Sequence, residues 1–469
     1  MNVPRIIIAG LWTDGGKTTV ATGIMGALLK KKLDVQAFKS GPDMIDASYH
    51  TAVTKKPSRT LDAWLTSPRT VLEIFERSSR DADIAVIEGG MGLFDGMTWM
   101  VGGVDDYEST AQIARILQAP VILVVDVGNV QAHIVDMIRN LVFRFSKWFD
   151  KKVKVRGIIL NNVKSSRRME LKKLIELVAK IPVVGVIPYN PEISLPSRRG
   201  GLIPIVGNEA LKITLYKLVE HVEKYVDINK VLDIAKKAEE LPDIKNKIFP
   251  HQPIKEKVTV GVAFDESFHF LFQDNIDLLR AYGAKIVFFS PIHDKKLPAD
   301  IHGLYFPGGF PDMFAEQLTA NQTMRESIRD AAYDEMPIYS EHGGSVYLTK
   351  SITDFRGFTF PMVDVLSGEA SMETTLQALD STIMKTIEDN LLSQRGMVIH
   401  GREFHFIKIG EISQDSKFAY QMHIGKGING KYEGWMEHNI LALLGHVHLA
   451  FNSKLAKNFI CHSAQYKRK

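Results

Sequence analysis

A glycine-rich segment between an apolar run and a helix most constrains what this chain can fold into. The sequence AGLWTDGGKTT, residues 9–19, follows the β-branched run Arg5 to Ala9 and precedes a helix expected to begin near Lys17. Glycines let backbone N–H groups turn inward around phosphate oxygens, and a helix N-terminus adds partial positive charge. The segment therefore predicts a P-loop variant, one residue longer between its outer glycines than the commonest form.

Within this loop each residue type has an expected role. Lys17 would reach the β and γ phosphates of a nucleotide, and the Thr18 hydroxyl would bind Mg²⁺. A glycine turn that merely begins a helix is the alternative, but strand, loop, Lys-Thr-Thr and helix all agree with a phosphate site. The predicted nucleotide-binding residues are Gly10, Gly15, Gly16, Lys17, Thr18 and Thr19, with Asn161 added as a residue that reads adenine or simply forms a turn.

Apolar runs alternate with amphipathic stretches through the first half of the chain. Such runs are typical of strands buried on both faces, so we expect an α/β fold with a mostly parallel sheet and helices on both faces. The predicted strands are Arg5 to Ala9, Val35 to Phe38, Ile84 to Ile87, Val121 to Val125, Val155 to Leu160 and Val183 to Ile187.

A charged, proline-punctuated stretch separates two expected domains. Residues 1–225 are predicted to form a P-loop domain, 226–257 a linker, and 258–469 a second domain. In the second domain the alternation restarts, with strands expected at Val258 to Phe264, Ile286 to Phe289, Gly303 to Phe306 and Pro337 to Tyr339 and a helix around Asn275 to Ala281.

Charged residues follow the second and third predicted strands, where the carboxyl ends of parallel strands should meet the nucleotide. FKSGPD offers Lys39 and Asp43, and IEGGMGLFDG offers Glu88. Mg²⁺ favours a few hard oxygens and keeps several waters, so Thr18, Asp43 and Glu88 make a predicted metal set. Each acid taken alone is also compatible with a helix cap or an ion pair.

Composition narrows the function classes. The net charge of +4, from 58 Lys and Arg against 54 Asp and Glu, gives no reason to expect nucleic acid. The single cysteine, Cys461, excludes an internal disulfide, and no run of about 18 apolar residues suggests a membrane span. We expect a cytoplasmic protein without nucleic-acid or membrane partners.

Several motifs in order resemble the cobyrinic acid a,c-diamide synthase family. They are GLWTDGGKTT, FKSGPDMIDASYH, TLDAWL, EGGMGLFDG, GIILNNV, LPSRRGGLIP, YFPGGFPDMFAEQL, GREFHF and GHVHLAF, and they span nearly the whole chain. The resemblance implies a dethiobiotin-synthetase-like ATPase domain followed by a flavodoxin-like class I glutamine-amidotransferase domain. It also implies ATP-dependent amidation of a tetrapyrrole or corrinoid carboxylate through an acyl phosphate.

The resemblance assigns roles to particular residues. Lys17, Lys39 and Asp46 would be catalytic, with ATP and Mg²⁺ as cofactors. The second substrate, a polycarboxylate, would face Asp62, Arg198 and Arg199, since an Arg pair suits carboxylates, although a solvated basic turn is equally consistent with that pair. We expect either a homodimer or association with a separate protein that supplies ammonia.

The second domain departs from the family at its nucleophile. The resemblance implies an elbow reading Glu-Cys-Gly-Gly, but here YSEHGGSVYL puts His342 at the cysteine position. Imidazole cannot replace a thiolate in forming a thioester. We therefore expect His342 and His446 to mark a degenerate amidotransferase site, and a metal site built with His448 is not predicted. His405 in GREFHF is structural or faces the substrate.

Three functions remain open on the sequence. The leading one is a tetrapyrrole amide ligase that uses free ammonia or ammonia from a partner. The second is a ligase for another polycarboxylate or amine, and the third is a non-catalytic nucleotide-binding partner of a true amidotransferase.

Overall fold

The chain forms two compact units. The computed structural model describes residues 2–96, 108–128, 153–164, 168–198, 201–252, 254–410, 412–413 and 415–468. One unit comprises Met1–Ala63 with Ser67–Lys245, and the other comprises Trp64–Thr66 with Asn246–Lys469. Among the described residues, no helix combines the length and apolar character needed to cross a membrane.

The first unit is built on a seven-stranded sheet whose neighbouring strands are all parallel, in the order β3-β2-β4-β1-β5-β6-β7. Its strands are β1 (Arg5–Gly10), β2 (Val35–Ser40), β3 (Arg59–Leu61), β4 (Ile84–Gly92), β5 (Val121–Asp126), β6 (Val155–Val163) and β7 (Val183–Pro188), with a hairpin of β8 (Ser197–Arg198) and β9 (Gly201–Leu202). The predicted parallel sheet is confirmed.

Helices cover both faces of this sheet, because successive side chains of a strand point to opposite faces. Ala37 of β2 packs into the core beneath α1, whereas the neighbouring Phe38 meets Phe75 of α3 at 5.1 Å between ring centroids. The helices are α1 (Lys17–Lys30), α2 (Met44–Thr54), α3 (Pro68–Ser79), α4 (Thr110–Ile116), α7 (Arg168–Ala179), α8 (Glu209–Tyr225) and α9 (Ile228–Ala235), with the 3-10 turn η3 (Pro191–Ile193).

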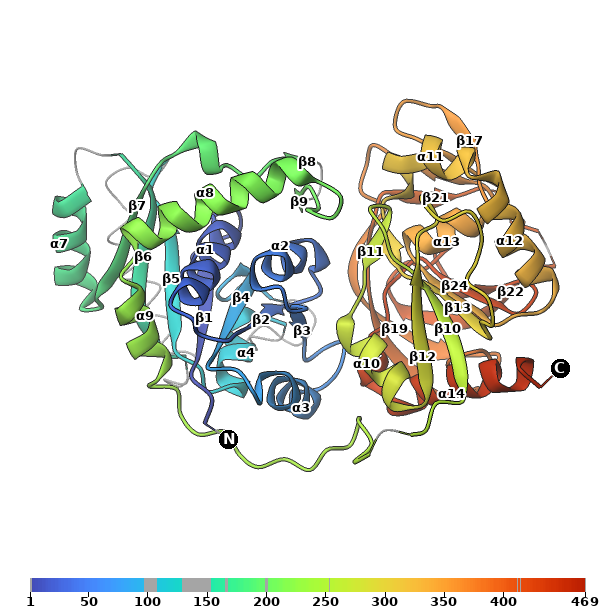
Figure 1. Ribbon diagram of the computed structural model, residues 1–469, viewed down its shortest axis with the longest axis horizontal. Helices are drawn as coiled ribbons and strands as arrows, with labels where there is room; N and C mark the ends of the chain where they lie inside the picture. Colours follow the sequence, from blue (N-terminus) through green and yellow to red (C-terminus); the bar gives the residue numbers. More distant parts are fainter. Residues whose placement is uncertain are drawn as a thin grey trace. The chain divides into compact units, whose positions relative to one another are not determined.

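The helix that follows the predicted P-loop is fixed by close packing. In Figure 1, α1 and α8 lie side by side over the sheet. A Cβ on Gly26 of α1 would stand 2.3 Å from Cγ2 of Val219 on α8, and a Cβ on Gly23 would stand 2.4 Å from Cγ2 of Val222. Only glycine allows this approach, so the two glycines set the position of α1 and of the loop at its N-terminus.

The segment 226–257, expected as a linker, includes the short helix α9. Its Ile228, Val231 and Ile234 are buried in the core of the first unit. Asp227 caps the helix by accepting a hydrogen bond from the Lys230 N–H at 3.1 Å. The charged residues that suggested a linker lie on the exposed side of this amphipathic helix and beyond its end.

The second unit contains a nine-stranded sheet in the order β12-β10-β13-β15-β24-β23-β22-β19-β20. The strands from β12 to β24 pair in parallel, and those from β24 to β20 pair antiparallel. The members are β10 (Val258–Ala263), β12 (Ala284–Phe289), β13 (Gly303–Phe306), β15 (Ile338–Glu341), β19 (Ala378–Thr386), β20 (Val398–His405), β22 (Lys417–Ile424), β23 (Tyr432–Met436) and β24 (Ile440–Leu443). The predicted α/β class is confirmed. The antiparallel strands extend the sheet beyond the parallel part that was predicted.

Smaller sheets and helices complete this unit. β11 (Phe268–Phe270) pairs with β14 (Gly308–Gly309), and a four-stranded sheet is formed by β16 (Ser351–Thr353), β17 (Thr359–Pro361), β18 (Ala370–Met372) and β21 (Ile407–Ile409). The helices are α10 (Gln273–Ala281), α11 (Ala315–Ala320), α12 (Gln322–Tyr333), α13 (Gly343–Leu348) and α14 (Ser453–Tyr466), with the 3-10 turns η4 (Pro311–Phe314) and η5 (Leu449–Phe451).

Candidate functional site

The glycine loop after β1 has the backbone that a phosphate-binding turn requires. Gly16, the residue before α1, has φ of 79°, which a side chain rarely permits, and a Cβ there would stand 2.2 Å from Nδ2 of Asn161. A Cβ on Gly10 would stand 2.7 Å from Cδ of Lys17. Asn161 of β6 donates to the Gly15 carbonyl at 3.4 Å. Lys17 and Asn161 therefore approach the loop closely at two glycines, where a side chain would not fit.

Two neighbouring strands and the start of α1 bring polar and charged groups to the same edge of the sheet. Lys39 of β2 is directly opposite Glu88 of β4 in the parallel register, and its Nζ lies 3.0 Å from Glu88 Oε1. The same oxygen accepts a hydrogen bond from the Thr18 hydroxyl at 2.8 Å. Thr18 and Glu88, both predicted for a metal, are therefore in direct contact, and Lys39 joins them.

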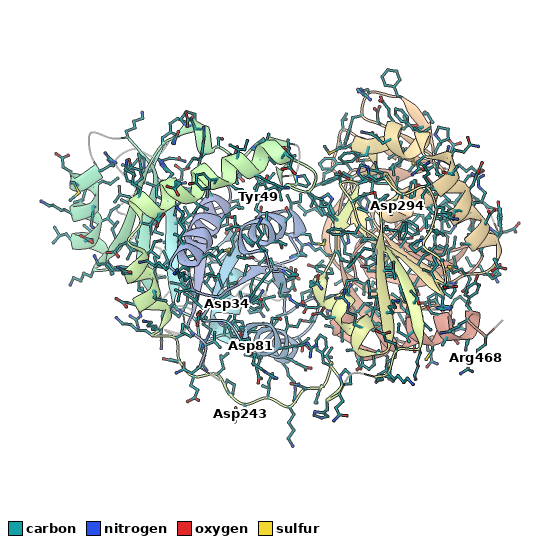
Figure 2. All side chains as sticks on the ribbon, in the orientation of Figure 1. Asp34, Tyr49, Asp81, Asp243, Asp294 and Arg468 are labelled. Atoms are coloured by element: carbon teal, nitrogen blue, oxygen red, sulfur yellow. The ribbon has the colours of Figure 1, made fainter. Side chains whose placement is uncertain are left out.

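Asp46 completes a buried charge network on α2. Its Oδ2 lies 2.6 Å from Lys39 Nζ, and Lys39 also donates to the Gly89 carbonyl at 3.0 Å. Tyr49 of the same helix, labelled in Figure 2, donates its hydroxyl to the Ile203 carbonyl and anchors α2 to the chain after β9. The predicted catalytic residues Lys39 and Asp46 are brought together by this anchoring.

Burial and neighbouring charges set the protonation of these groups. Burial lowers the pKa of Lys39, but the charges of Asp46 and Glu88 outweigh it and raise that pKa above its ordinary value. Burial raises the pKa of Glu88, but the Lys39 charge and the His50 hydrogen bond hold it below its ordinary range. Burial and the nearby Asp43 charge raise the pKa of Asp46 well above its usual range. Lys39 and Glu88 therefore form an ionised pair.

Lys17 differs from Lys39 in having no carboxylate partner among the residues that the structure describes. Its side chain is buried, yet within the described part of the chain its ammonium makes no ion pair. Burial lowers the pKa of Lys17, and the Lys39 charge lowers it further, against the opposing charges of Glu88, Asp46 and Asp14. A buried cation without a partner is costly, and an incoming anion would relieve that cost.

The remaining predicted residues differ in their burial and in the element that carries them. Asp43 is exposed and caps α2, where its Oδ1 accepts from the N–H groups of Ile45 at 2.9 Å and Asp46 at 3.0 Å. Thr19 is half-buried on α1, and Asp62 is buried just after β3. Arg198 belongs to β8, and Arg199 lies outside the described residues.

One contact of the site and the burial of one residue were not expected from the sequence. His50, fully buried on α2, places Nε2 at 2.6 Å from Glu88 Oε2. The signal was present, because Asp46 and His50 stand four residues apart and therefore share one face of the helix. Glu88 was expected at the end of a strand and outside the core, but it is fully buried among its partners.

The elbow in the second unit has the strained backbone typical of a nucleophile position. His342 connects β15 to α13 with φ of 46° and ψ of −117°, and its N–H donates to the Leu443 carbonyl at 2.8 Å. A Cβ on Gly343 would stand 2.5 Å from the Gly309 carbonyl, and one on Gly344 would stand 2.4 Å from the Phe306 carbonyl. The sequence prediction of a tight elbow at His342 therefore agrees with this geometry.

Histidines gather around this elbow. The ring of His342 stacks on His446 with centroids 5.2 Å apart, and His405 lies 6.4 Å from His342. His446 Nδ1 is 3.3 Å from Oε2 of Glu341, a partner that sequence reasoning missed. Burial, followed by the proximity of His446 and His405, lowers the pKa of His342 well below its ordinary value, and burial lowers the pKa of His405 to about 4. These two imidazoles are therefore neutral near pH 7.

The imidazole cluster is not arranged as a metal site. In the described ranges, no group of three or more His, Cys, Asp or Glu side chains is placed to hold a metal ion. His448 caps η5, its Nδ1 accepting from the Ala450 N–H at 3.2 Å. Cys461, the chain's single cysteine, is exposed on α14.

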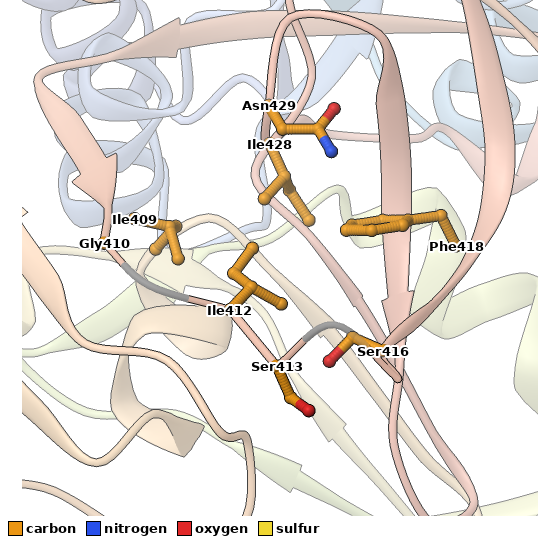
Figure 3. A pocket seen from close by; sticks show the side chains of 8 residues that line it. All are labelled: Ile409, Gly410, Ile412, Ser413, Ser416, Phe418, Ile428 and Asn429. Atoms are coloured by element: carbon orange, nitrogen blue, oxygen red, sulfur yellow. The ribbon is translucent and has the colours of Figure 1, made fainter.

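A separate cavity of about 390 Å³ lies in the second unit. Figure 3 shows its wall of Ile409, Ile412, Phe418 and Ile428, with Ser413, Ser416 and Asn429 adding polar atoms. None of the predicted site residues lines it.

The chain is similar to known proteins along nearly its whole length. Residues 6–203 match a family described as the CobQ/CobB/MinD/ParA nucleotide binding domain, and residues 259–454 match the CobB/CobQ-like glutamine amidotransferase domain. The chain is 38% identical over 465 residues to a cobyrinate a,c-diamide synthase from Dehalococcoides mccartyi strain CBDB1, covering 98% of each. It is 35% identical to relatives of the same name from Caldanaerobacter subterraneus subsp. tengcongensis, covering 99% of each chain, and from Archaeoglobus fulgidus, covering 98% of this chain and 97% of that relative.

Proposed function

Because the chain belongs to the cobyrinate a,c-diamide synthase family, as its motifs indicated, we propose that it is an ATP-dependent amide ligase acting on side-chain carboxylates of cobyrinate or a related tetrapyrrole. The observation that carries the proposal is the convergence of Lys17, Lys39, Thr18 and Glu88 beside the open glycine loop. A scaffold protein would have no physical need for this buried charge set.

The proposed reaction has two steps. A substrate carboxylate oxygen attacks the γ phosphorus of ATP, the bond to the β-γ bridging oxygen breaks, and ADP leaves from an acyl phosphate. Ammonia then attacks the acyl carbon, phosphate leaves, and the nitrogen loses a proton to give the amide. Phosphoryl transfer asks a protein chiefly for positioning and charge stabilisation. Lys17 would offset the charge on the β and γ phosphates, while Lys39, held by Asp46, would face the transferred group.

The residues present fit Mg·ATP. A Cβ at Gly10 or Gly16 would fill the loop where phosphate oxygens are expected, and Thr18 and Glu88 offer a hydroxyl and a carboxylate, the hard oxygens that Mg²⁺ prefers. When bound, Mg²⁺ neutralises phosphate charge. Asp43, exposed at the start of α2, is proposed as the third oxygen donor, directly or through water, and Asn161 as a contact to the nucleotide. Asp62, Arg198 and Arg199 are proposed to face the polycarboxylate.

We further propose that nitrogen arrives as free ammonia, or from a partner protein, because the glutaminase site is inactive. His342 occupies the elbow, and Cys461, the chain's single thiol, lies on α14. Glutamine hydrolysis of this kind begins with a thiolate at the elbow. His446 and Glu341 keep the geometry of a base and its orienting carboxylate, but they have no thiol to activate.

The experiment that tests the proposal measures ADP release from Mg·ATP with cobyrinate and ammonium chloride, and follows amide formation by mass. ADP release that depends on both cobyrinate and ammonium, with one mass unit lost per amide formed, would support it. ATP cleavage that is the same without any carboxylate would contradict it. Sirohydrochlorin and its metal complexes, tested in parallel by thermal shift, identify a substrate other than cobyrinate.

Asp43→Asn is expected to reduce Mg²⁺-dependent turnover by about 10–100-fold while leaving the fold intact. The asparagine keeps an Oδ1 that can accept from the Ile45 and Asp46 N–H groups, so the cap of α2 remains, but the negative charge is lost. Turnover is measured as a function of Mg²⁺ concentration, beside thermal melts.

The matched control is Asp227→Asn, which makes the same change at the cap of α9. It should alter neither turnover nor its Mg²⁺ dependence. If the Asp43 variant loses melting temperature and activity in equal measure and added Mg²⁺ restores nothing, then Asp43 is only a helix cap.

A further inference from the structure

His50 is buried, and apolar packing alone gives no reason for an imidazole at this position. It is fully buried on α2, in a position where a leucine or phenylalanine would avoid the cost of a buried polar ring. Both ring nitrogens have polar partners instead: Nε2 lies 2.6 Å from Glu88 Oε2, and Nδ1 lies 3.3 Å from the Ser58 hydroxyl. The ring therefore links Glu88 to the segment that precedes β3.

The partners define which nitrogen carries hydrogen. Glu88 is ionised, so its oxygen only accepts, and Nε2 of His50 must be the donor. Nδ1 is hydrogen-bonded to the Ser58 hydroxyl at 3.3 Å, and this second contact fixes the plane of the imidazole. A side chain that contacts a carboxylate closely, and is itself anchored on its far side, holds that carboxylate in one orientation. Residues outside a metal site commonly orient its ligands in this way.

The two oxygens of Glu88 are consequently divided between separate tasks. Oε2 is held by His50, whereas Oε1 faces the Thr18 hydroxyl and the Lys39 ammonium. We propose that His50 is a positioning residue that fixes the rotation of the Glu88 carboxylate, so that Oε1 is presented to the metal and phosphate groups bound beside Thr18. This inference rests on the Mg·ATP site proposed above and adds a residue to it.

To orient Glu88, residue 50 must place a hydrogen-bond donor where Nε2 of His50 lies. The side-chain amide nitrogen of glutamine reaches about as far along the side chain as Nε2, whereas that of asparagine stops near the position of Nδ1. His50→Gln should therefore keep the contact to Glu88, while His50→Asn and His50→Leu should lose it.

The test measures binding of the β,γ-imido analogue of ATP by calorimetry, with Mg²⁺ and with EDTA. His50→Leu and His50→Asn are expected to weaken binding with Mg²⁺ by about 10–100-fold and to change binding in EDTA by less than about threefold. His50→Gln should stay near the wild type under both conditions. Ser58→Ala, which frees the ring but leaves Nε2 in place, should have a smaller effect of the same kind.

A double-mutant cycle separates positioning from packing. In a Glu88→Gln background, His50→Leu should cost less than about twofold further in Mg²⁺-dependent affinity, since the carboxylate to be oriented is gone. The proposal is overturned if His50→Leu weakens binding equally with Mg²⁺ and EDTA, if His50→Gln behaves like His50→Leu, or if the cost is the same in both backgrounds. Should His50→Leu not fold, the Gln, Asn and Ser58→Ala comparisons decide the question.

The wild type in the same experiment tests the proposed function separately. If Mg²⁺ does not tighten binding of the ATP analogue to the unmodified protein, the proposed Mg·ATP site fails, whatever the variants do. If Mg²⁺ tightens binding to the wild type, but His50→Gln and His50→Leu change this binding to the same extent, only the role of His50 fails.

Discussion

Lys17→Ala is expected to lower carboxylate-dependent ATP cleavage by about 10³-fold, the scale on which a charge stabiliser acts in phosphoryl transfer. Lys17 is buried beside the glycine loop, and in the described part of the chain it has no carboxylate partner of its own. Alanine removes a cation placed for phosphate without breaking an existing ion pair, so the protein should fold. ADP release under saturating cobyrinate and ammonium measures the loss, and melting curves measure the fold.

Lys30→Ala is the matched control, because Lys30 ends the same helix but pairs with Glu220 and Glu223 on the surface. Exposed pairs of this kind contribute little to stability, and turnover should be unchanged. Unaltered turnover and nucleotide affinity in Lys17→Ala would remove the loop from the mechanism.

Glutamine is expected to give no amide product with the purified protein, whereas ammonium salts are expected to support the full reaction. The elbow residue is His342, whose pKa is held well below its ordinary value by burial and then by His446 and His405, so it is a neutral imidazole. It cannot form the glutamyl thioester, and ammonia leaves glutamine as that thioester forms. Cys461 lies on another element, α14. Glutamate release and amide formation are measured with each nitrogen source in turn.

Cys461→Ser provides the control, since an unchanged profile shows that the exposed thiol plays no part. His342→Cys should fold, because cysteine is smaller than histidine and the backbone already has an elbow conformation. Glutamate release by the unmodified protein, at a rate coupled to ATP cleavage, would mean that another nucleophile exists and that the proposed nitrogen source is wrong.

The first unit could be predicted well because its local signals and its tertiary structure agree. β1 and β2 are buried along their whole length, and the Ile6 to Ala9 run of β1 is unambiguously apolar. The antiparallel half of the second sheet was not predicted, because strands such as β22 mix exposed, half-buried and buried residues without a regular alternation and contain Lys417 and Gln421. α9 was missed because a short amphipathic helix among lysines resembles a linker.

The site was predictable in its residue types but not in its connections. Motif spacing suggested Lys39, Asp46 and Glu88 near the loop, but not that Glu88 is fully buried with His50 on one oxygen and Lys39 on the other. Such pairings depend on strand register and helix rotation, which no single segment encodes. Glu341 was missed for the same reason: only the pairing of β15 with β24 brings it near His446.

The elbow at His342 also has an architectural consequence. Gly343 and Gly344 pack directly on the carbonyls of Gly309 and Phe306, so the turn joins α13 to the strand end and loop beside it. These contacts are made by glycines and backbone carbonyls, so they do not depend on which side chain stands at position 342. Similarity over residues 259–454 therefore reports the architecture of the domain, whereas release of ammonia from glutamine depends on the side chain at the elbow.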